Sequence, residues 1–115
     1  MANQAIKGMK KNEKFLGEPC SVGKAMGIIK GRWSFPIIRV LLMNGTLRFK
    51  ELERSVANIN TRMLVKELKE MEAEGLVFRK AYATVPPTVE YSLTEKGQAL
   101  KPVIKEIEKW AEKFL

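Results

Sequence analysis

Residues 59–75 read INTRMLVKELKEMEAEG and are the most informative segment of this 115-residue sequence. Asn60 suits the N-cap of a helix because its side chain can accept a backbone N–H, and Gly75 suits the position just after the last turn. The helix predicted over residues 61–74 has an apolar face formed by Leu64, Leu68 and Met71. The side chains away from that face are Thr61, Arg62, Val65, Lys66 and Lys69. The segment therefore predicts an amphipathic helix with a basic outward face.

A shorter helix is predicted immediately upstream, over residues 49–56, because apolar side chains recur there at helical spacing. Residues 57–59 form the turn between the two helices. The apolar side chains on the inner side of both helices are Phe49, Leu52, Val56, Ile59, Leu64, Leu68 and Met71. Two helices joined by a tight turn are typical of a helix-turn-helix, in which the first helix braces the second in the major groove of DNA. Residues 46–48 can add one short strand ahead of them.

Downstream of these helices, two segments rich in β-forming residues predict a β-hairpin. Residues 76–83 alternate loosely, and residues 88–93 place Val89, Tyr91 and Leu93 on one side. The connection Thr84-Val85-Pro86-Pro87 cannot continue a strand ladder, because proline has no backbone N–H to donate. A hairpin that directly follows a helix-turn-helix predicts the wing of a winged helix.

Two more helices are predicted before the helix-turn-helix. The first covers residues 21–29, with Cys20 or Ser21 at its N-cap. The second covers residues 33–42 and is apolar nearly all round, so it should be central and buried. Residues 1–19 carry several lysines and few apolar side chains. They are either a mobile basic arm that a partner orders or a tail without a role.

The last helix is predicted from Thr94 to the C-terminus, with Pro102 kinking or dividing it. Beyond the proline, an apolar stripe is formed by Val103, Ile104, Ile107, Trp110, Ala111 and Phe114. One small domain has little core in which to bury this stripe, so the stripe predicts a dimer interface; packing within the chain is the alternative. The expected fold class is mainly α with a small β-hairpin (α+β). It is a winged helix-turn-helix in one domain over residues 20–115, flanked by N- and C-terminal helices for dimerisation.

The composition favours a polyanionic partner. Lysine and arginine number 21 against 13 aspartates and glutamates, which leaves a formal charge of +8. One cysteine and no histidine exclude a disulfide within the chain and a zinc finger. Without a glycine-rich phosphate loop or a nucleophile beside a base, we expect no enzyme, cofactor or metal. No signal peptide or membrane span is evident, so a cytoplasmic protein without a membrane partner is expected.

Basic and polar side chains around the helix-turn-helix are candidates for DNA contacts. Residues at the start of a recognition helix approach base edges, so Arg62 could bond a guanine and Val65 could pack on a thymine methyl. Residues farther along the helix, ahead of it and in the hairpin are placed for phosphates or the minor groove. The full set of candidates is Arg48, Lys50, Thr61, Arg62, Val65, Lys66, Lys69, Arg79, Lys80 and Thr84. For any single lysine, a solvated helix face is the alternative.

Four motifs carry a family resemblance. They are Gly31-Arg32-Trp33, Arg48-Phe49-x-Glu51-Leu52, Ile59-x-x-Arg62-Met63-Leu64 and Val85-Pro86-Pro87-x-Val89-Glu90-Tyr91-x-Leu93-Thr94. Together they resemble the HxlR-type transcription regulators, a branch of the MarR-like winged-helix proteins, over about residues 20–110. The resemblance implies a homodimer without enzymatic activity, with dimer contacts from the first and last helices. It also implies an operator with dyad symmetry and two recognition helices about 34 Å apart.

Cys20 is the candidate for a redox-sensing residue. The resemblance implies that a cysteine here can respond to oxidants, quinones or aldehydes by thiol modification or an intersubunit disulfide. A thiol at a helix N-terminus favours its reactive thiolate form, and the neighbouring Lys24 would add to this. As the only cysteine, it could link only to a partner chain or to a small thiol. The alternative is a buried structural cysteine. Ser21 stands where some relatives have a proline, which changes the helix cap.

These observations predict a sequence-specific DNA-binding transcription regulator, most simply a dimeric repressor on a palindromic operator. Its partners would be double-stranded DNA and a second copy of the chain, with a small molecule or an oxidant as effector. The alternative is a winged-helix protein-interaction module without sequence-specific DNA binding. The outward face of residues 61–69 discriminates between the two, because a charged face suits DNA and an apolar face suits a protein. Here that face is mostly basic.

Overall fold

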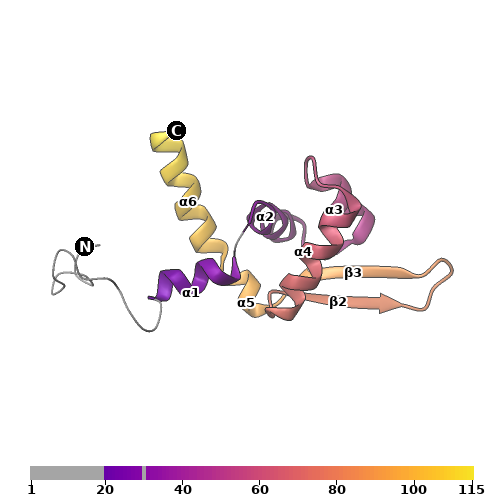
Figure 1. Cartoon of the computed structure of the whole chain (residues 1–115). Coiled ribbons are helices and arrows are strands. Elements are labelled where there is room, and N and C mark those ends of the chain that lie inside the picture. Colours follow the sequence, from indigo (N-terminus) through magenta and orange to yellow (C-terminus); the bar gives the residue numbers. More distant parts are fainter. Residues whose placement is uncertain (1–19, 30) are drawn as a thin grey trace.

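The computed structural model describes residues 20–29 and 31–115. The arm predicted over residues 1–19 lies outside this part of the chain. The elements are α1 (Ser21–Ile28), α2 (Ser34–Asn44), β1 (Leu47–Arg48), α3 (Phe49–Ser55), α4 (Thr61–Ala73), β2 (Val77–Tyr82), β3 (Thr88–Leu93), α5 (Glu95–Gln98) and α6 (Lys101–Phe114). Helices α1 and α6 lie at one end of the molecule and the β2–β3 hairpin at the other, with α2, α3 and α4 between them (Figure 1).

The ends of the first and fourth helices follow local signals in the sequence. The side chain of Asn60 accepts a hydrogen bond of 2.8 Å from the backbone N–H of Met63, which caps α4. Gly75 follows this helix with a φ of 75°, a left-handed conformation that glycine adopts without strain. Of the two expected caps for α1, Cys20 takes the position. Its Sγ atom accepts a hydrogen bond of 3.4 Å from the backbone N–H of Gly23.

The C-terminal helix is divided, as Pro102 led us to expect. Helices α5 and α6 are separate, and the proline lies in the first turn of α6, where its missing N–H costs no hydrogen bond. Thr94 caps α5 and also ties it to the end of α4. Its hydroxyl accepts from the backbone N–H of Gly97 at 3.1 Å and donates to the backbone oxygen of Gly75 at 2.6 Å. The hairpin, α4 and α5 therefore meet at one junction.

The three strands form one antiparallel sheet in the order β1-β3-β2. The predicted hairpin is present, with Arg79 opposite Tyr91 and Lys80 opposite Glu90. The short strand ahead of α3 is also present, and its Leu47 lies opposite Tyr91 on the other side of β3. The strand pattern alone did not indicate that β1 and β3 pair, because their residues are more than 40 positions apart.

The core lies where the helices meet the sheet. Its buried apolar side chains are Ile37, Ile38, Leu41, Leu52, Val56, Ile59, Leu64, Leu68, Met71, Leu76, Val77, Tyr91, Leu93 and Ile104. The inner face predicted for the helix-turn-helix is confirmed, with Phe49 half-buried against the core. The expectation that residues 33–42 are central and buried is confirmed for their apolar side chains. Ile37, Ile38 and Leu41 are in the core, while Trp33, Phe35, Val40 and Leu42 are partly buried against it and Arg39 is exposed. Helices α3 and α6 and strand β3 contact α2 and leave another side open. The fold is a winged helix-turn-helix.

The apolar stripe of α6 divides between the core and the surface. Ile104 is only 7% exposed and packs in the core of its own chain, which corrects its expected place in a dimer interface. The physical reason is that α6 leans on α2, so the side of the helix that carries Ile104 faces inward. The other large side chains of the stripe, Val103, Ile107, Trp110 and Phe114, are exposed. None of the described helices combines the length and the apolar character needed to cross a membrane.

Candidate nucleic-acid interface

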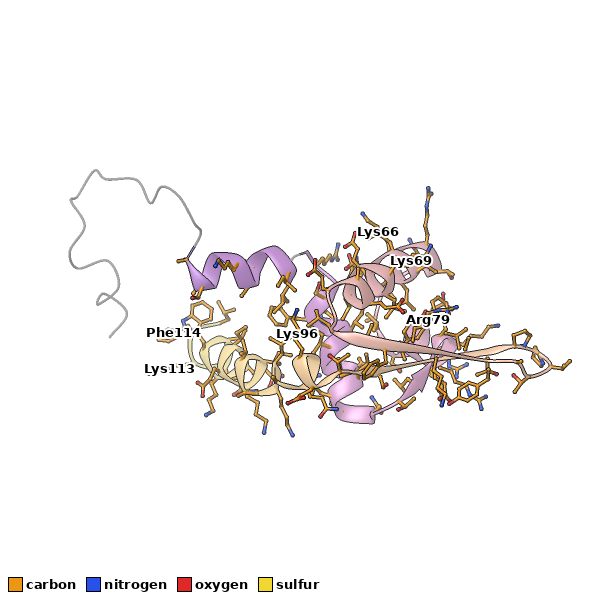
Figure 2. The ribbon with its side chains drawn as sticks, turned by 90° about the horizontal axis from the view of Figure 1, so that it is seen from below. Lys66, Lys69, Arg79, Lys96, Lys113 and Phe114 are labelled. Carbon is orange, nitrogen blue, oxygen red and sulfur yellow. The ribbon has the colours of Figure 1, made fainter. Side chains whose placement is uncertain are left out.

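The outward face of α4 presents basic side chains around one apolar residue. Arg62, Lys66 and Lys69 are exposed, and Val65 is 39% exposed among them. Figure 2 labels Lys66 and Lys69 on this helix. The opposite face of α4 is buried in the core, so packing fixes the position of the helix while its basic side is exposed to solvent. An α-helix fits the major groove of B-DNA. There, this face of α4 would offer hydrogen-bond donors from its basic side chains and an apolar contact from Val65 to the base edges.

The hydroxyl of Thr61 is used in a contact between the two helices of the helix-turn-helix. It donates to the carboxylate oxygen Oε2 of Glu53, which connects the start of α4 to α3. The turn between these helices contains Asn58 with a φ of 66°, a left-handed conformation that asparagine tolerates better than most residues. The Thr61 side chain remains exposed, but in this structure its hydroxyl proton is committed to Glu53. Its position favours a role in joining the helices.

A groove of about 1000 Å³ separates α3 and α4 from the hairpin. Its basic lining residues are Arg48, Lys50, Arg54, Lys69 and Arg79. Its apolar lining residues are Phe49, Val65, Pro86, Pro87, Val89 and Tyr91. The groove therefore brings together predicted contact residues from four elements, β1, α3, α4 and β2. Thr61, Arg62 and Lys66 do not line it and lie on the first half of α4.

The two basic residues of the hairpin lie on opposite faces of the sheet. Arg79 is opposite Tyr91 and lines the groove with it. Lys80 is the next residue along and is opposite Glu90, so its side chain points to the other face. There its Nζ atom lies 5.1 Å from the ring centroid of Tyr82, whose hydroxyl donates to Glu90 at 3.1 Å. Of the pair, only Arg79 shares the groove with α4.

The remaining hairpin candidate, Thr84, lies in the connection between β2 and β3. Its hydroxyl donates to the backbone oxygen of Pro86 at 2.7 Å and lies 3.1 Å from the hydroxyl oxygen of Thr88. These contacts stay within the hairpin tip. Thr84 is exposed, but its polar atom is used to shape the turn.

Three charged residues of the groove were missed by sequence reasoning. Arg54 lines the groove from α3, four residues after Lys50, and that helical spacing is the signal that could have found it. Glu51 and Glu72 also line the groove. The Glu51 carboxylate accepts from the backbone N–H of Arg48 at 2.8 Å, so part of its hydrogen-bonding capacity is used at the start of α3. The groove is basic overall but carries acidic groups at two positions.

Glu67 is an unexpected acidic residue on the inner side of α4. It is 8% exposed, although its neighbours on that side are leucines. Burial raises the pKa of the Glu67 carboxyl above its usual range, and the nearby Glu70 raises it further, while Lys66 acts in the opposite direction. A buried carboxylate is costly in an apolar environment, so this position lowers stability when the group is ionised.

Cys20 is exposed at the start of α1, and the alternative of a buried structural cysteine is therefore wrong for this chain. Its sulfur caps the helix through the contact with Gly23. Figure 1 shows α1 at the same end of the molecule as α6 and far from the hairpin. The thiol is thus accessible and lies away from the groove.

Comparisons with known proteins agree with this fold. The model of the HxlR-like helix-turn-helix family matches residues 28–115. An uncharacterized HTH-type transcriptional regulator of Halalkalibacterium halodurans, BH0655, is 45% identical over 91 residues, which cover 79% of this chain and 80% of that protein. A MarR-family protein from Porphyromonas gingivalis W83 has a crystal structure similar to this one, with a TM-score of 0.80 and 40% identity over 90% of this chain and 100% of that chain.

Two further solved structures are of named regulators. The redox regulator HypR in its reduced form has a TM-score of 0.73 and 39% identity, covering 80% of this chain and 90% of that one. Quinone-bound YodB from Bacillus subtilis has a TM-score of 0.71 and 36% identity, covering 84% of this chain and 100% of that one. The family match covers the helix-turn-helix, the hairpin and the last helix. The chain therefore belongs to the HxlR-like helix-turn-helix family and is a DNA-binding transcription regulator with a MarR-like winged helix.

Proposed function

We propose that two copies of this chain form a homodimeric repressor that binds a palindromic operator in the cytoplasm. Each subunit places α4 in the major groove, where Arg62, Val65 and Lys66 face the base edges. The basic residues of the groove bind the flanking phosphates. The observation that carries this proposal is the exposed basic face of α4 beside a groove lined by further cations. Phosphate contacts position such a protein, and base contacts give it specificity.

The surface of α1 and α6 supports the dimer. Val103, Ile107, Trp110 and Phe114 are exposed on α6, with the Trp110 and Phe114 ring centroids 5.7 Å apart. Helix α1 lies at the same end of the molecule (Figure 1), and its Val22 and Met26 are also exposed. An exposed apolar stripe of this kind on one helix is uncommon on a monomer and favours a partner. A palindromic operator requires two subunits, so a second copy is the partner proposed.

Binding of selected DNA tests the operator proposal. A duplex obtained by selection from a random library is compared with a scrambled duplex of equal composition, by fluorescence anisotropy at 150 mM salt. We expect the selected duplex to bind at least about 1000-fold more tightly, as specific binding does. Equal affinities would refute sequence-specific recognition.

A pair of matched variants tests whether α4 carries the recognition. Arg62→Ala with Lys66→Ala should abolish the preference for the selected duplex and leave the sedimentation coefficient unchanged. Lys105→Ala with Lys109→Ala removes the same charge from the polar face of α6 and should keep the preference. If both pairs weaken binding equally, net charge and not the α4 face determines affinity.

The dimer is tested by analytical ultracentrifugation. Ile107→Glu places a charge in the exposed stripe and should produce a monomer that binds the palindrome more weakly. Lys105→Glu changes charge on the opposite side of α6 and should remain dimeric. A wild-type protein that sediments as a monomer at micromolar concentration would refute the dimer.

A protein-interaction module is the second candidate, and the structure favours it less. Such a module needs an apolar outward face on α4, whereas that face carries Arg62, Lys66 and Lys69 around the single apolar residue Val65.

We also propose that Cys20 is a redox-sensing thiol. Its exposure at the start of α1 supports this, as does the similarity to the redox regulator HypR and to quinone-bound YodB. A diamide oxidant would take two electrons and two protons from two thiols, either Cys20 of each subunit or Cys20 and a small thiol, and form one disulfide. Non-reducing electrophoresis, mass measurement and operator affinity before and after diamide test this. Unchanged mobility, mass and affinity in both the wild type and Cys20→Ser would refute it.

A further inference from the structure

The connection between β2 and β3, residues 83–87, is here called the wing tip. It reads ATVPP and contains no charged side chain. Val85 is 100% exposed, so its isopropyl group is fully in water in the free protein. A branched apolar side chain that stays fully exposed removes no apolar area from water, so it does not stabilise the fold. Its position at the extreme end of the hairpin suits contact with another molecule.

Contacts within the wing tip determine its shape in the free protein. The Thr84 hydroxyl donates to the backbone oxygen of Pro86 and lies beside the hydroxyl of Thr88. Two successive prolines, Pro86 and Pro87, restrict the backbone further. A loop held in this way loses little conformational entropy on binding. The wing tip is therefore a preorganised apolar protrusion.

The wing tip borders the same groove as α4. Pro86 and Pro87 line one side of it, and Val65 and Lys69 of α4 line another, with Arg79 among the basic residues. Each sugar-phosphate strand of B-DNA separates a major groove from a minor groove. If α4 occupies the major groove, the adjacent strand lies along the basic groove of the protein. The wing tip then reaches the neighbouring minor groove, about 6 Å wide.

We propose that the wing tip selects A·T base pairs in the minor groove beside each half-site by apolar shape readout through Val85. This inference rests on the proposed function. Neither proline has a backbone N–H, and the Val85 side chain has no polar atom. The guanine 2-amino group is the donor that distinguishes G·C from A·T in the minor groove. Against Val85 that amino group would lose its hydrogen bond to water, whereas A·T pairs present no buried donor there.

Inosine separates this contact from major-groove recognition. An I·C pair matches G·C in the major groove but lacks the 2-amino group, so its minor groove resembles that of A·T. Starting from the selected operator, each base pair flanking the half-sites is made A·T, G·C or I·C, and affinity is measured by anisotropy. We expect A·T and I·C to bind equally and G·C about tenfold more weakly at one or two positions per half-site.

Two variants assign the effect to the wing tip. Val85→Gly removes the isopropyl group from a fully exposed position, so folding is spared, and should reduce the G·C discrimination to less than about twofold. Arg79→Ala should weaken all three duplexes equally and keep their ratio, because Arg79 lines the groove and not the tip.

The outcomes distinguish this inference from the proposed function. If no duplex binds better than scrambled DNA, both the proposed function and the wing-tip inference are refuted. If the selected operator is preferred but A·T, I·C and G·C bind equally at every flanking position, only the wing-tip inference is overturned. The same holds if I·C binds like G·C, or if Val85→Gly retains the full discrimination.

Discussion

Replacing Gly97 with alanine tests the junction that fixes the hairpin on the helices. Gly97 is buried in α5 beside the backbone of Leu76, the residue just before β2. A Cβ atom at this position would lie 2.3 Å from the Leu76 carbonyl oxygen and 3.0 Å from Cδ2 of Leu93. The leucine side chain can rotate, but the carbonyl oxygen already accepts a hydrogen bond of 3.0 Å from the backbone N–H of Thr94. The clash is therefore with backbone that is held in place.

The expected loss of stability follows from this geometry. Overpacking a buried site typically costs about 1–3 kcal/mol, and a rigid backbone neighbour places Gly97→Ala near 3 kcal/mol. For a domain of this size, a loss of that magnitude lowers Tm by about 10 °C. Because the junction joins α4, α5 and the hairpin, the same variant should expose the hairpin amides to faster hydrogen exchange.

Thermal unfolding followed by circular dichroism measures the effect, with Gly27→Ala as the matched control. A Cβ atom at Gly27 would meet nothing within 4 Å, and the residue is in α1. Alanine is favoured over glycine in a helix by about 1 kcal/mol, so the control should keep or slightly raise Tm. A Tm for Gly97→Ala within about 2 °C of wild type would refute the reasoning, because it would mean that the junction relaxes without cost.

Three other changes test the charges of the molecule. Arg79→Ala should reduce the slope of log affinity against log salt concentration by about 1, and Lys80→Ala should leave it unchanged; equal slopes in the two variants would contradict their opposite faces. Glu67 has a raised pKa, so the folded state binds its proton more tightly than the unfolded chain, and stability falls as pH rises from the usual glutamate range through the raised pKa. Glu67→Gln should therefore raise Tm at pH 7, with the gain disappearing as pH is lowered into the usual glutamate range; a pH-independent gain would point to packing instead. The bridge between Arg39 and Glu108, at 2.7 Å, is partly exposed, so a double-mutant cycle should give a coupling below about 1 kcal/mol, and a larger value would show that it holds α6 in place.

Local signals were sufficient to predict most elements of the fold. Asn60 and Gly75 bracket α4 because capping depends only on residues within a turn of the helix end. Pro86 and Pro87 mark the hairpin tip because they cannot join a strand ladder. Pro102 divides the last helix for a similar local reason. Each of these features is determined by backbone chemistry within a few residues.

The candidate site was only partly predictable, because sequence spacing does not show which face of an element meets its neighbour. The alternation of a strand places Arg79 and Lys80 on opposite faces, but only the packing of Tyr91 shows that Arg79 faces the groove. Arg54 was missed because it lines the groove only by virtue of the packing of α3 beside the hairpin, which the sequence does not show. Thr61 remains a predicted DNA contact, and the sequence did not indicate that its hydroxyl donates a hydrogen bond to Glu53.

The sequence alone was enough to predict the order of the elements, the inner face of the helix-turn-helix and the basic character of the outward face of α4. These follow from periodicity, capping and charge, which act between near neighbours along the chain. The packing of the folded chain was needed to show that Ile104 belongs to the core while Trp110 stays exposed, and that Val65 and Arg79 line one groove. Those outcomes depend on the register of the sheet and on the packing of α6 against α2, which bring together residues far apart in the sequence.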